Sequence, residues 1–520
     1  MSSDLILSGI SSAMRGLYAS QEAIDTAGAD ITNANTPGYS REEVQLAAVD
    51  YSQAGLATSG DPSVASIPGG VDVTGVARMR DQFLDDQYRS SNLSLSEQTT
   101  TSQYINQIQG LFNEPSTTGI QQQLSNFFDA WNTLAANPTQ ASARGALVQT
   151  AESLTNSLNQ ASSSLTAIRQ QADTQLATDV TQVNSMFSQI AGLNKQIATA
   201  EGTGAQPNAL LDQRDELLDK LSGYAKVQLS QQSNGETWVY IAGKAVVAGD
   251  TAMPLTATQN GELTFSNVTY QGAALSADTL GGEMGALLKV RDQLIGRPIV
   301  PSTSPLQNTP GGLLYQMDTL SNSLATAVNS LTEAGTTLAE AGTAVTTTPP
   351  PGQPFFVINS TGNQFNSSII NSADIEVNPL FDSPGGLDQI PCGGPPVGGI
   401  APPAGDNTTA TAVAALQTSL ISDGTFGAPT TSGTYTAQDL YTNMLTQLGS
   451  QGQSAQSQQT NQQALVTQIN TQRQSTSGVN LDEEMTNLVK FQHAYEASAR
   501  LISTFDSMLN TIINNMGSNG

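Results

Sequence analysis

Apolar residues recur at a spacing of three and four along both ends of this sequence, which is the heptad period of helices that pack against other helices. Near the N-terminus the stripe consists of Leu7, Ile10, Met14, Leu17, Ile24 and Ile31. Near the C-terminus it consists of Leu481, Met485, Leu488, Tyr495, Ala499, Ile502, Leu509 and Ile513. A lone helix cannot bury such a stripe in water. We therefore expect the two terminal helices to pair as a coiled coil and then to pack against neighbouring copies of the chain.

The limits of the terminal helices follow from local signals. The first helix should end in the sequence Asn-Thr-Pro-Gly at residues 35–38, because proline pushes the preceding residue out of the helical region and glycine permits a turn. The last helix should begin after Asn480, which is a favourable N-cap. Glu483, three residues later, completes the pattern of a capping box.

Long helices are also predicted in the interior. A heptad pattern runs through residues 142–200 and is shifted once by an extra four-residue step, which locally unwinds a supercoil without breaking the helix. At 1.5 Å per residue this helix would be ~85 Å long. Further helices are predicted from near residue 81 and over residues 208–221, 283–295, 313–340, 407–420 and 437–476. Together these patterns predict a rod of long helices.

Two interior stretches depart from the helical pattern. Residues 226–281 contain Trp238-Val239-Tyr240-Ile241, several glycines and alternating apolar residues, which predicts a small β region. Residues 345–404 are rich in proline and glycine and predict loops with a few strands. A third β-type stretch ends at residues 69–73, between the first helix and the helix that begins near residue 81.

The predicted fold class is therefore mainly α with inserted β domains. The terminal coiled-coil domain would comprise residues 1–40 and 478–520, the long-helix rod domain residues 41–225, 282–344 and 405–477, and the outer β-containing domain residues 226–281 and 345–404.

The charge and cysteine content exclude several classes of protein. Acidic residues number 44 against 18 basic ones, and this excess argues against binding to nucleic acid or to anionic membrane surfaces. The single cysteine, Cys392, permits no intrachain disulfide bond. The first ten residues lack the pattern of a cleaved signal peptide, and no apolar run is long enough for a membrane span.

The sequence offers little material for catalysis. A histidine-dependent mechanism would have to use the only histidine, His493, which falls within the C-terminal helix. Asp212 and Asp215 lie three residues apart with Arg214 between them, and we interpret them as a solvated, charge-paired helix face. We predict no catalytic, metal-binding or cofactor-binding residues and no cofactor, and we expect a structural protein.

The motifs at the two ends resemble those of the bacterial flagellar axial proteins, which form the rod, the hook and the hook-associated parts. The N-terminal signature comprises Met14-Arg15-Gly16-Leu17, Ala27 and residues 33–41, Asn-Ala-Asn-Thr-Pro-Gly-Tyr-Ser-Arg, with Asn33, Asn35, Pro37, Gly38 and Tyr39 forming the motif turn. The C-terminal signature comprises residues 479–484, Val-Asn-Leu-Asp-Glu-Glu, followed by Leu488, Phe491-Gln492, Ala494-Tyr495, Ala497 and Ala499-Arg500.

Internal motifs narrow this resemblance. Residues 210–218, Leu-Leu-Asp-Gln-Arg-Asp-Glu-Leu-Leu, and residues 281–288, Gly-Gly-Glu-Met-Gly-Ala-Leu-Leu, with Arg291-Asp292, resemble the hook-associated protein 1 (FlgK) family, the first hook–filament junction proteins. Gly405-Asp406-Asn407 before a helix also fits. The pattern is lost over residues 341–404, and Glu333-Ala334-Gly335 stands where most relatives have a nearby histidine.

This resemblance implies a structural subunit that joins the hook to the filament, located in the extracellular flagellum and in the cytoplasm before export. It implies export through the flagellar type III apparatus. The implied partners are further copies of the chain, the hook protein, the second hook–filament junction protein and an export chaperone of the FlgN type. That chaperone would bind the C-terminal stripe. Two alternatives stay open at this point, namely another axial protein or an acidic secreted adhesin.

Overall fold

The computed structural model describes residues 2–51, 67–259, 265–296, 311–344, 352–359, 370–421 and 434–517. The chain divides into two compact units. Unit 1 comprises Met1–Leu95, Thr181–Leu255 and Gln462–Gly520, and unit 2 comprises Ser96–Val180 and Thr256–Asn461. This division cuts across the predicted rod domain and the predicted β-containing domain, parts of which lie in both units. The boundaries of the three predicted domains stay a prediction.

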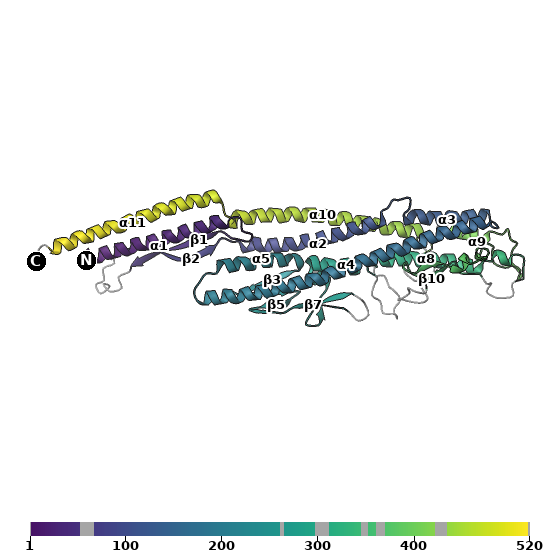
Figure 1. The fold of residues 1–520 in the computed structure, drawn as a ribbon, viewed down its shortest axis with the longest axis horizontal. Coiled ribbons are helices and arrows are strands. Elements are labelled where there is room, and N and C mark those ends of the chain that lie inside the picture. The colour runs from purple at the N-terminus through teal and green to yellow at the C-terminus, as the bar shows by residue number, and fades with distance from the viewer. Residues whose placement is uncertain are drawn as a thin grey trace. The chain divides into compact units, whose positions relative to one another are not determined.

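The two ends of the chain meet in unit 1. The helices α1 (Ser2–Asn33) and α11 (Leu481–Gly517) lie side by side (Figure 1), which confirms the predicted contact between the terminal helices. The strands β1 (Glu42–Tyr51) and β2 (Ile67–Arg78) form an antiparallel ribbon that packs against α1. Gly70 permits this close approach, since its φ is +91° and an added Cβ would lie 3.0 Å from the Cα of Ser12.

The rest of unit 1 contains helix segments and a small sheet. It includes the beginning of α2 (Gln82–Phe112), the end of α4 (Ala141–Gly202), the helix α5 (Asn208–Tyr224) and the end of α10 (Ala437–Ser477). The sheet has the order β3 (Val227–Gln231), β4 (Thr237–Ile241), β5 (Lys244–Ala248) and β6 (Thr251–Ala252). It confirms the β region predicted after residue 226.

Unit 2 is mainly helical. It contains the remaining parts of α2, α4 and α10, together with α3 (Ile120–Ala136), α6 (Ala277–Leu280), α7 (Gly282–Lys289), the π-helical turn Val290–Leu294, α8 (Leu313–Ala334) and α9 (Thr408–Ala415). The 3-10 turns are Leu338–Glu340, Pro379–Asp382 and Gly386–Gln389. A three-stranded sheet consists of β7 (Leu255–Gln259), β8 (Ser266–Tyr270) and β9 (Ala273–Ala274), and β10 (Phe356–Ile358) pairs with β11 (Ile375–Val377). The first residue of β7 belongs to unit 1.

The heptad positions of α4 form much of the core. The helix is continuous over 62 residues, so the extra four-residue step is accommodated without a break. The buried positions on this stripe are Leu147, Ala151, Leu154, Leu158, Ala161, Leu165, Ile168, Ala172, Leu176, Val180, Val183, Phe187, Ile190 and Ile197. Burial of an uninterrupted stripe of this length stabilises a helix that its polar outer face alone would not hold together.

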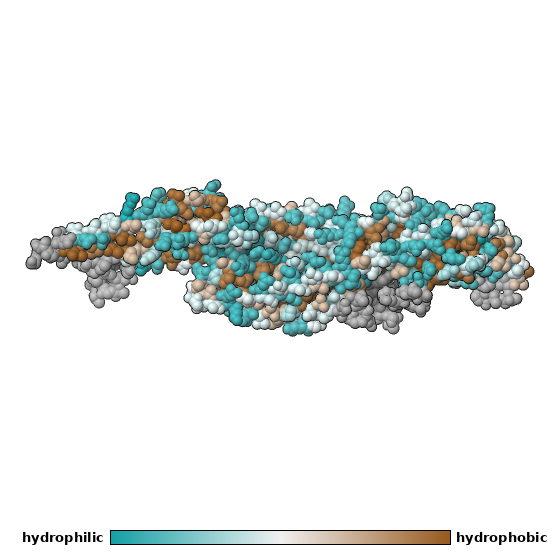
Figure 2. All heavy atoms as spheres, in the orientation of Figure 1, coloured by the Kyte–Doolittle hydropathy of each residue, from teal (hydrophilic) through white to brown (hydrophobic). Residues whose placement is uncertain are grey.

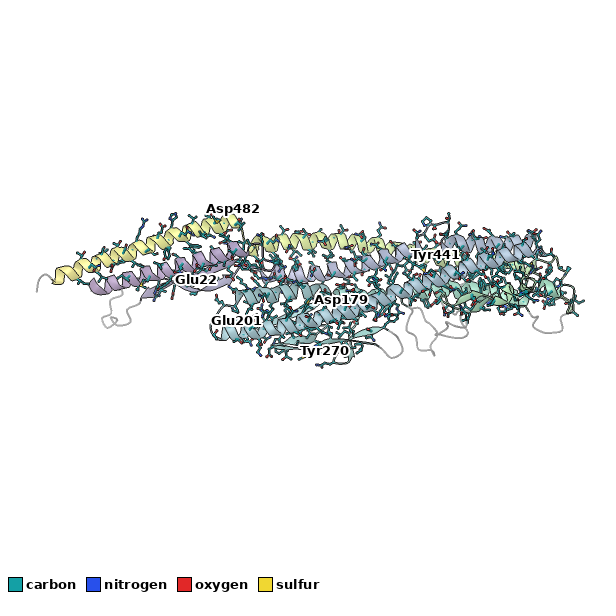
Figure 3. The ribbon with its side chains drawn as sticks, viewed as in Figure 1. Glu22, Asp179, Glu201, Tyr270, Tyr441 and Asp482 are labelled. Carbon is teal, nitrogen blue, oxygen red and sulfur yellow. The ribbon has the colours of Figure 1, made fainter. Side chains whose placement is uncertain are left out.

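Aromatic side chains form a second part of the core of unit 2. Trp131 on α3 is fully buried, and its ring centroid lies 5.2 Å from that of Phe355. Phe355 in turn stacks on Phe381 at 5.5 Å. On α10, Tyr441 (Figure 3) packs edge-on against Phe112 at 6.3 Å and is also buried. These contacts join α3 to the irregular segment near β10, and α2 to α10.

Three predicted helices differ in detail from the observed ones. The helix predicted over 313–340 ends at Ala334, because Gly335 adopts an extended backbone, and only a 3-10 turn follows. The helix predicted over 283–295 changes to a π-helical turn at Val290. The helix predicted over 407–420 ends at Ala415. Residues 345–351 and 360–369 of the predicted loop region 345–404 lie outside the described residues, and the rest of it holds loops, 3-10 turns and the strands β10 and β11.

Candidate functional site: the terminal helix pair and the turn at its base

Where α1 packs against α11, α1 contributes small residues that let the two helices approach closely. A Cβ added to Gly9 would lie 2.7 Å from the ring of Phe505, and one added to Gly16 would lie 3.3 Å from the Oγ of Ser498. The most buried apolar residues of α1 are all small, namely Ala13, Ala19, Ala23 and Ala27. Small side chains let the helix axes approach closely, so the pair is held by backbone proximity and by the larger side chains of α11.

The pair buries only part of the predicted stripes. On α1, Ile10, Leu17, Ile24 and Ile31 are half-buried, Met14 is 42% exposed, and the side chain of Leu7 lies outside the described part of the chain. On α11, Leu488, Ala499, Ile502 and Leu509 are half-buried. The other predicted residues of α11, Leu481, Met485, Tyr495 and Ile513, are exposed. Much of the apolar surface of both helices therefore stays in contact with solvent.

Hydrogen bonds within the motif turn after α1, and one to the buried Asp30, hold the turn in place. The backbone amide of Thr36 donates to the carbonyl of Asn33 at 2.8 Å, and that of Tyr39 donates to Thr36 at 3.2 Å. The hydroxyl of Tyr39 donates to the buried carboxylate of Asp30 at 2.7 Å. Gly38 has a φ of +81°, which explains the glycine at this position.

The other predicted residues of the turn differ in their contacts and exposure. Asn33 donates from its side chain to the carbonyl of Ala29, whereas Asn35, Pro37 and Gly38 are exposed. The turn thus presents part of its signature to solvent. These exposed residues line an open groove of about 1370 Å³, together with residues of the segment that leads into α11.

The N-terminal and C-terminal signatures meet at this turn. The backbone amide of Arg41 donates to the carbonyl of Ser477 at 2.9 Å. The guanidinium of Arg41 lies 3.0 Å from a carboxylate oxygen of Glu483 and 2.9 Å from one of Glu484. Asn480 caps α11 as predicted, with its side chain accepting from the amide of Asp482. The carboxylate of Glu483, assigned to a capping box from the sequence, pairs with Arg41.

The internal motif on α5 reaches the same turn. The amide and the hydroxyl of Ser40 donate to the carboxylate of Asp212 at 2.9 and 2.7 Å. The interpretation of Asp212 and Asp215 as a solvated face is therefore wrong, because Asp212 is 6% exposed and both residues face arginines from β2 and the following link. The intervening Arg214 points elsewhere and donates to Asn194 and to the carbonyl of Gly235.

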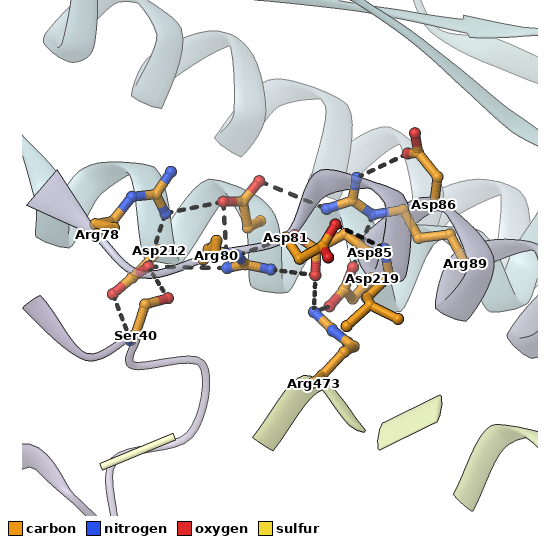
Figure 4. Close-up of polar contacts among 12 residues, drawn as sticks. Ser40, Arg78, Arg80, Asp81, Asp85, Asp86, Arg89, Asp212, Asp219 and Arg473 are labelled. Carbon is orange, nitrogen blue, oxygen red and sulfur yellow. Dashed lines mark hydrogen bonds and ion pairs between the residues drawn. The ribbon is translucent and has the colours of Figure 1, made fainter. Parts of the chain in front are cut away.

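Four arginines and four aspartates form an ion-pair cluster beside the turn (Figure 4). Its members are Arg78, Arg80, Arg89 and Arg473, and Asp85, Asp212, Asp215 and Asp219. At its centre Asp215 lies 2.9 Å from Arg78, 3.2 Å from Arg80 and 3.5 Å from Arg89. Because the charges balance, the cluster can be partly buried without leaving an uncompensated ion.

The C-terminal segment contributes one member of this cluster. Arg473, near the end of α10, lies 2.8 Å from Asp85 and 2.7 Å from Asp219. It also stacks over the ring of Tyr88 at 4.4 Å. The cluster thereby joins the end of β2, the beginning of α2, the motif of α5 and the end of α10. Apart from the spacing of the aspartates on α5, no pattern in the sequence predicted this arrangement.

The electrostatics of Asp215 follow from these neighbours. Burial alone would raise the pKa of its carboxyl group, but the guanidinium groups of Arg80, Arg78 and Arg89 outweigh this effect and lower the pKa below the ordinary value of 3.8. A lowered pKa in the folded chain means that the carboxylate stabilises the fold above the ordinary pKa. This contribution is lost as the pH falls through the lower pKa of the folded state.

We expect Asp215→Ala to destabilise unit 1 by about 3 kcal/mol, because it leaves three arginines without their shared carboxylate. The two tryptophans allow the units to be measured separately, since Trp238 lies in unit 1 and Trp131 in unit 2. Urea unfolding followed by tryptophan fluorescence in a Trp131→Phe background reports on unit 1. Asp86→Ala is the matched control, as Asp86 is 61% exposed and 3.7 Å from Arg89. Equal losses in both variants would contradict the role assigned to the cluster.

The second internal motif is also used for packing. Arg291 is 2% exposed, its guanidinium lies 2.6 Å from Asp173 and it also donates to the carbonyl of Ser266. Gly285 lies against α6, where an added Cβ would be 2.6 Å from the carbonyl oxygen of Ala277. The motif thus fixes α7 and the π-helical turn in unit 2.

Chemical function finds little support in the described part of the chain. Within those residues, no group of three or more acidic, histidine or cysteine side chains is placed to hold a metal ion. None of the helices described there is long and apolar enough to cross a membrane. His493 is exposed on α11. Cys392 is buried, and burial raises the pKa of its thiol to about 11, which makes it a poor nucleophile.

Comparison with known proteins places the chain in a family. Residues 105–356 match the family model described as the helical domain of flagellar hook-associated protein FlgK, and residues 463–516 match that of the C-terminal region of the flagellar basal body rod FlgEFG proteins. The flagellar hook-associated protein 1 of Bacillus subtilis (strain 168) is 30% identical over 98% of this chain and 99% of the relative. The chain belongs to the flagellar hook-associated protein 1 family.

Other members of the hook-associated protein 1 family agree over the full length. The Escherichia coli (strain K12) protein is 27% identical, with 97% of this chain and 99% of the relative covered. The solved structure of the flagellar hook junction protein FlgK from Burkholderia pseudomallei matches with a TM-score of 0.59, at 18% identity, covering 75% of this chain and all of that one. That structure supports the mainly helical fold.

Membership of the hook-associated protein 1 family settles several predictions. The resemblance drawn from the motifs is confirmed, as is the prediction of a structural protein that is not an enzyme. The chain is a component of the extracellular flagellum. The alternatives of a different axial protein or an acidic adhesin are excluded by matches that extend over nearly the whole chain.

Proposed function

We propose that this chain joins the hook to the filament of the bacterial flagellum and that its copies assemble through the exposed apolar surface of α1 and α11. The terminal surface, as we call it, consists of Met14, Tyr18, Leu481, Met485, Val489, Tyr495, Leu501, Met508 and Ile513. These side chains are 37–63% exposed. The residues of the predicted stripes that are half-buried in the free chain lie on the same two helices, and they would complete the interface between copies.

The distribution of exposed apolar side chains is the observation that carries this proposal. In the described part of the chain, nine of the sixteen large apolar side chains that are exposed lie on α1 and α11. Figure 2 shows apolar residues gathered along these two helices. Soluble monomers rarely gather so many exposed large apolar side chains on one pair of helices, so this surface is best explained by contact with further protein.

The partners follow from the position that we propose for the chain. On one side it would contact the hook protein, on the other the second hook–filament junction protein, and laterally further copies of itself. A ring of copies buries the terminal surface of each member against the next, as helices with wide apolar arcs require. The exposed part of the motif turn, with Asn35, Pro37 and Gly38, would lie at the base of each helix pair.

An export chaperone of the FlgN type is the proposed partner before assembly. The exposed residues of α11 would associate with other apolar surfaces at cytoplasmic concentrations, and a chaperone that covers them would prevent this. The prediction that the chain leaves the cell through the flagellar type III apparatus accords with such a chaperone.

Removing the protein from cells that otherwise build flagella is expected to give hooks without filaments, because the filament subunits would have no junction on which to assemble. Filament subunits should then accumulate in the medium. Electron microscopy of the cells and immunoblotting of the medium measure both effects, and expression of the intact chain from a plasmid should restore filaments. Filaments of normal number and length in the deletion strain would contradict the proposal.

A further inference from the structure

The guanidinium of Arg41 contacts the base of α11 from the N-terminal part of the chain. Arg41 donates a hydrogen bond from Nη2 to Glu483 at 3.0 Å. Its Nε forms an ion pair with Glu484 at 2.9 Å without a hydrogen bond, and its backbone amide donates to the carbonyl of Ser477. The side chain of Arg41 is 20% exposed and that of Glu484 only 4%. These contacts lie where α10 ends and α11 begins.

The surroundings of Arg41 are strongly acidic. Asp30 is fully buried and Glu484 is 3% exposed, and burial raises the pKa of both carboxyl groups. Arg41 acts against this rise at both residues. The carboxylate of Glu42 lies in the field of Asp30, and that of Glu483 adds negative charge near Glu484. Since Arg41 acts on the carboxyl groups of both Asp30 and Glu484, its guanidinium favours keeping Glu484 close to α1.

The seam itself leaves the axial position of α11 weakly determined near its base. The buried residues of α1 in this part are Ala19, Ser20, Ala23, Thr26, Ala27 and Asp30, which offer no large apolar side chain that could interlock. A large side chain meets a gap only further along, where Phe505 lies over Gly9. Smooth helix faces specify register poorly, and a polar contact at one position commonly supplies it.

We propose that Arg41 is the positioning residue of the terminal pair. Its hydrogen bond to Glu483 and its ion pair with Glu484 set the axial position of α11 along α1. They thereby decide which side chains of the terminal surface lie next to one another for the next copy to bind. This inference rests on the proposed function, because it assigns a role to Arg41 in the same assembly interface.

Arg41→Lys distinguishes a role in positioning α11 from a role that needs only the positive charge. It keeps the positive charge opposite Glu484, but its single ammonium group cannot contact Glu483 and Glu484 in the fixed geometry of the guanidinium fork. A residue that only stabilised the fold by its charge would tolerate this change. A residue that positions α11 would not.

The test measures binding of the purified full-length chain to isolated hooks by co-sedimentation. Arg41→Lys is expected to raise the half-saturating concentration about tenfold, which corresponds to about 1.4 kcal/mol. The urea unfolding midpoint of unit 1 should stay close to that of the unchanged chain. Hydrogen exchange should become faster in residues 481–491, with no change in α5. Arg500→Lys, the same substitution at an 84% exposed site on α11, is the matched control and should bind normally.

A second pair of variants covers the case of a folding defect. Arg41→Gln should destabilise unit 1, and the added Glu484→Gln should restore its stability by removing the uncompensated carboxylate. Hook binding should stay weak in the double variant, because the fork is still absent. If the double variant binds as tightly as the unchanged chain, or if hook affinity follows the unfolding midpoint through all variants, Arg41 is not a positioning residue.

A separate variant distinguishes this inference from the proposed function. Leu488→Asp disrupts the apolar interface and leaves Arg41 in place. Weak binding by Leu488→Asp together with normal binding by Arg41→Lys would overturn the positioning role alone. Normal binding by Leu488→Asp would overturn the proposed assembly interface, and the positioning role with it.

Discussion

Ile502→Asp is expected to leave the free chain folded and to abolish its attachment to hooks. Ile502 is half-buried on α11 in the free chain and would be fully covered in the proposed assembly. Burial of an unpaired carboxylate costs several kcal/mol, so an affinity loss of a thousandfold or more, about 4 kcal/mol, is expected. Leu488→Asp should behave in the same way because it occupies the same seam further toward the base. Complementation of a deletion strain, scored by electron microscopy for filaments, measures the effect in cells.

The neighbouring residue supplies the control for this prediction. Ser503→Asp introduces the same charge on the same helix, but the side chain is exposed and lies outside the predicted stripe. It should restore filaments as well as the unchanged chain does. Circular dichroism of the three purified variants should show the same helix content. Filaments in cells that carry Ile502→Asp would mean that α11 does not supply the assembly interface.

Asp179→Asn is expected to stabilise unit 2 at pH 8 and to have little effect at pH 4. Asp179 on α4 (Figure 3) is 2% exposed, and its Oδ1 accepts a hydrogen bond from Gln175 at 2.8 Å. Burial, and next the nearby carboxylate of Glu283, raise its pKa to about 7, while the bond from Gln175 lowers it. The ordinary pKa of an aspartate is 3.8. Burial also raises the pKa of Glu283.

The pH dependence follows from the sign of this shift. A carboxyl group with a raised pKa binds its proton more tightly in the folded chain, so its full contribution to stability is present below pH ~4. Stability is lost as the pH rises toward 7, and it levels off above that value. The amide of asparagine removes this loss, and we expect a gain of about 2 kcal/mol in the free energy of unfolding at pH 8.

Urea unfolding at several pH values measures this effect, with Trp131 as the reporter of unit 2 in a Trp238→Phe background. Asp129→Asn is the control, because Asp129 is exposed on α3 in the same unit. It should change the stability little at any pH. A stability difference between Asp179→Asn and the unchanged chain that does not vary between pH 4 and pH 8 would contradict the raised pKa.

Much of the helical framework could be predicted from residue periodicity. The heptad of α4 and its stutter, the N-cap at Asn480 and the break at Pro37 depend on residues within one or two turns of each other. The spacing that forms a helix is set by local backbone geometry, so a single sequence contains this information. The predicted ends of α8 and α9 lie too far along the chain. In the structure α8 ends before Gly335 and α9 ends in a turn after Ala415.

The candidate site could be predicted only in part. Periodicity identified the stripes on α1 and α11, but it did not show that half of α11's predicted stripe would remain exposed after pairing. The interpretation of Asp212 and Asp215 failed for a related reason. A helical face rich in charge resembles a solvated surface until the segments that carry the opposing arginines are brought against it.

By itself, the sequence determined that the ends are amphipathic helices, that the interior holds long helices with β insertions, and that the motifs are those of a flagellar axial protein. The tertiary structure alone decided that the two terminal signatures and the motif of α5 meet at one turn, where Arg41 contacts α11 and Ser40 donates to Asp212. It also decided that Asp179 is buried beside Glu283. The physical reason is that helix formation depends on neighbours in sequence. Burial and ion pairing depend on residues hundreds of positions apart, which only the folded chain brings into contact.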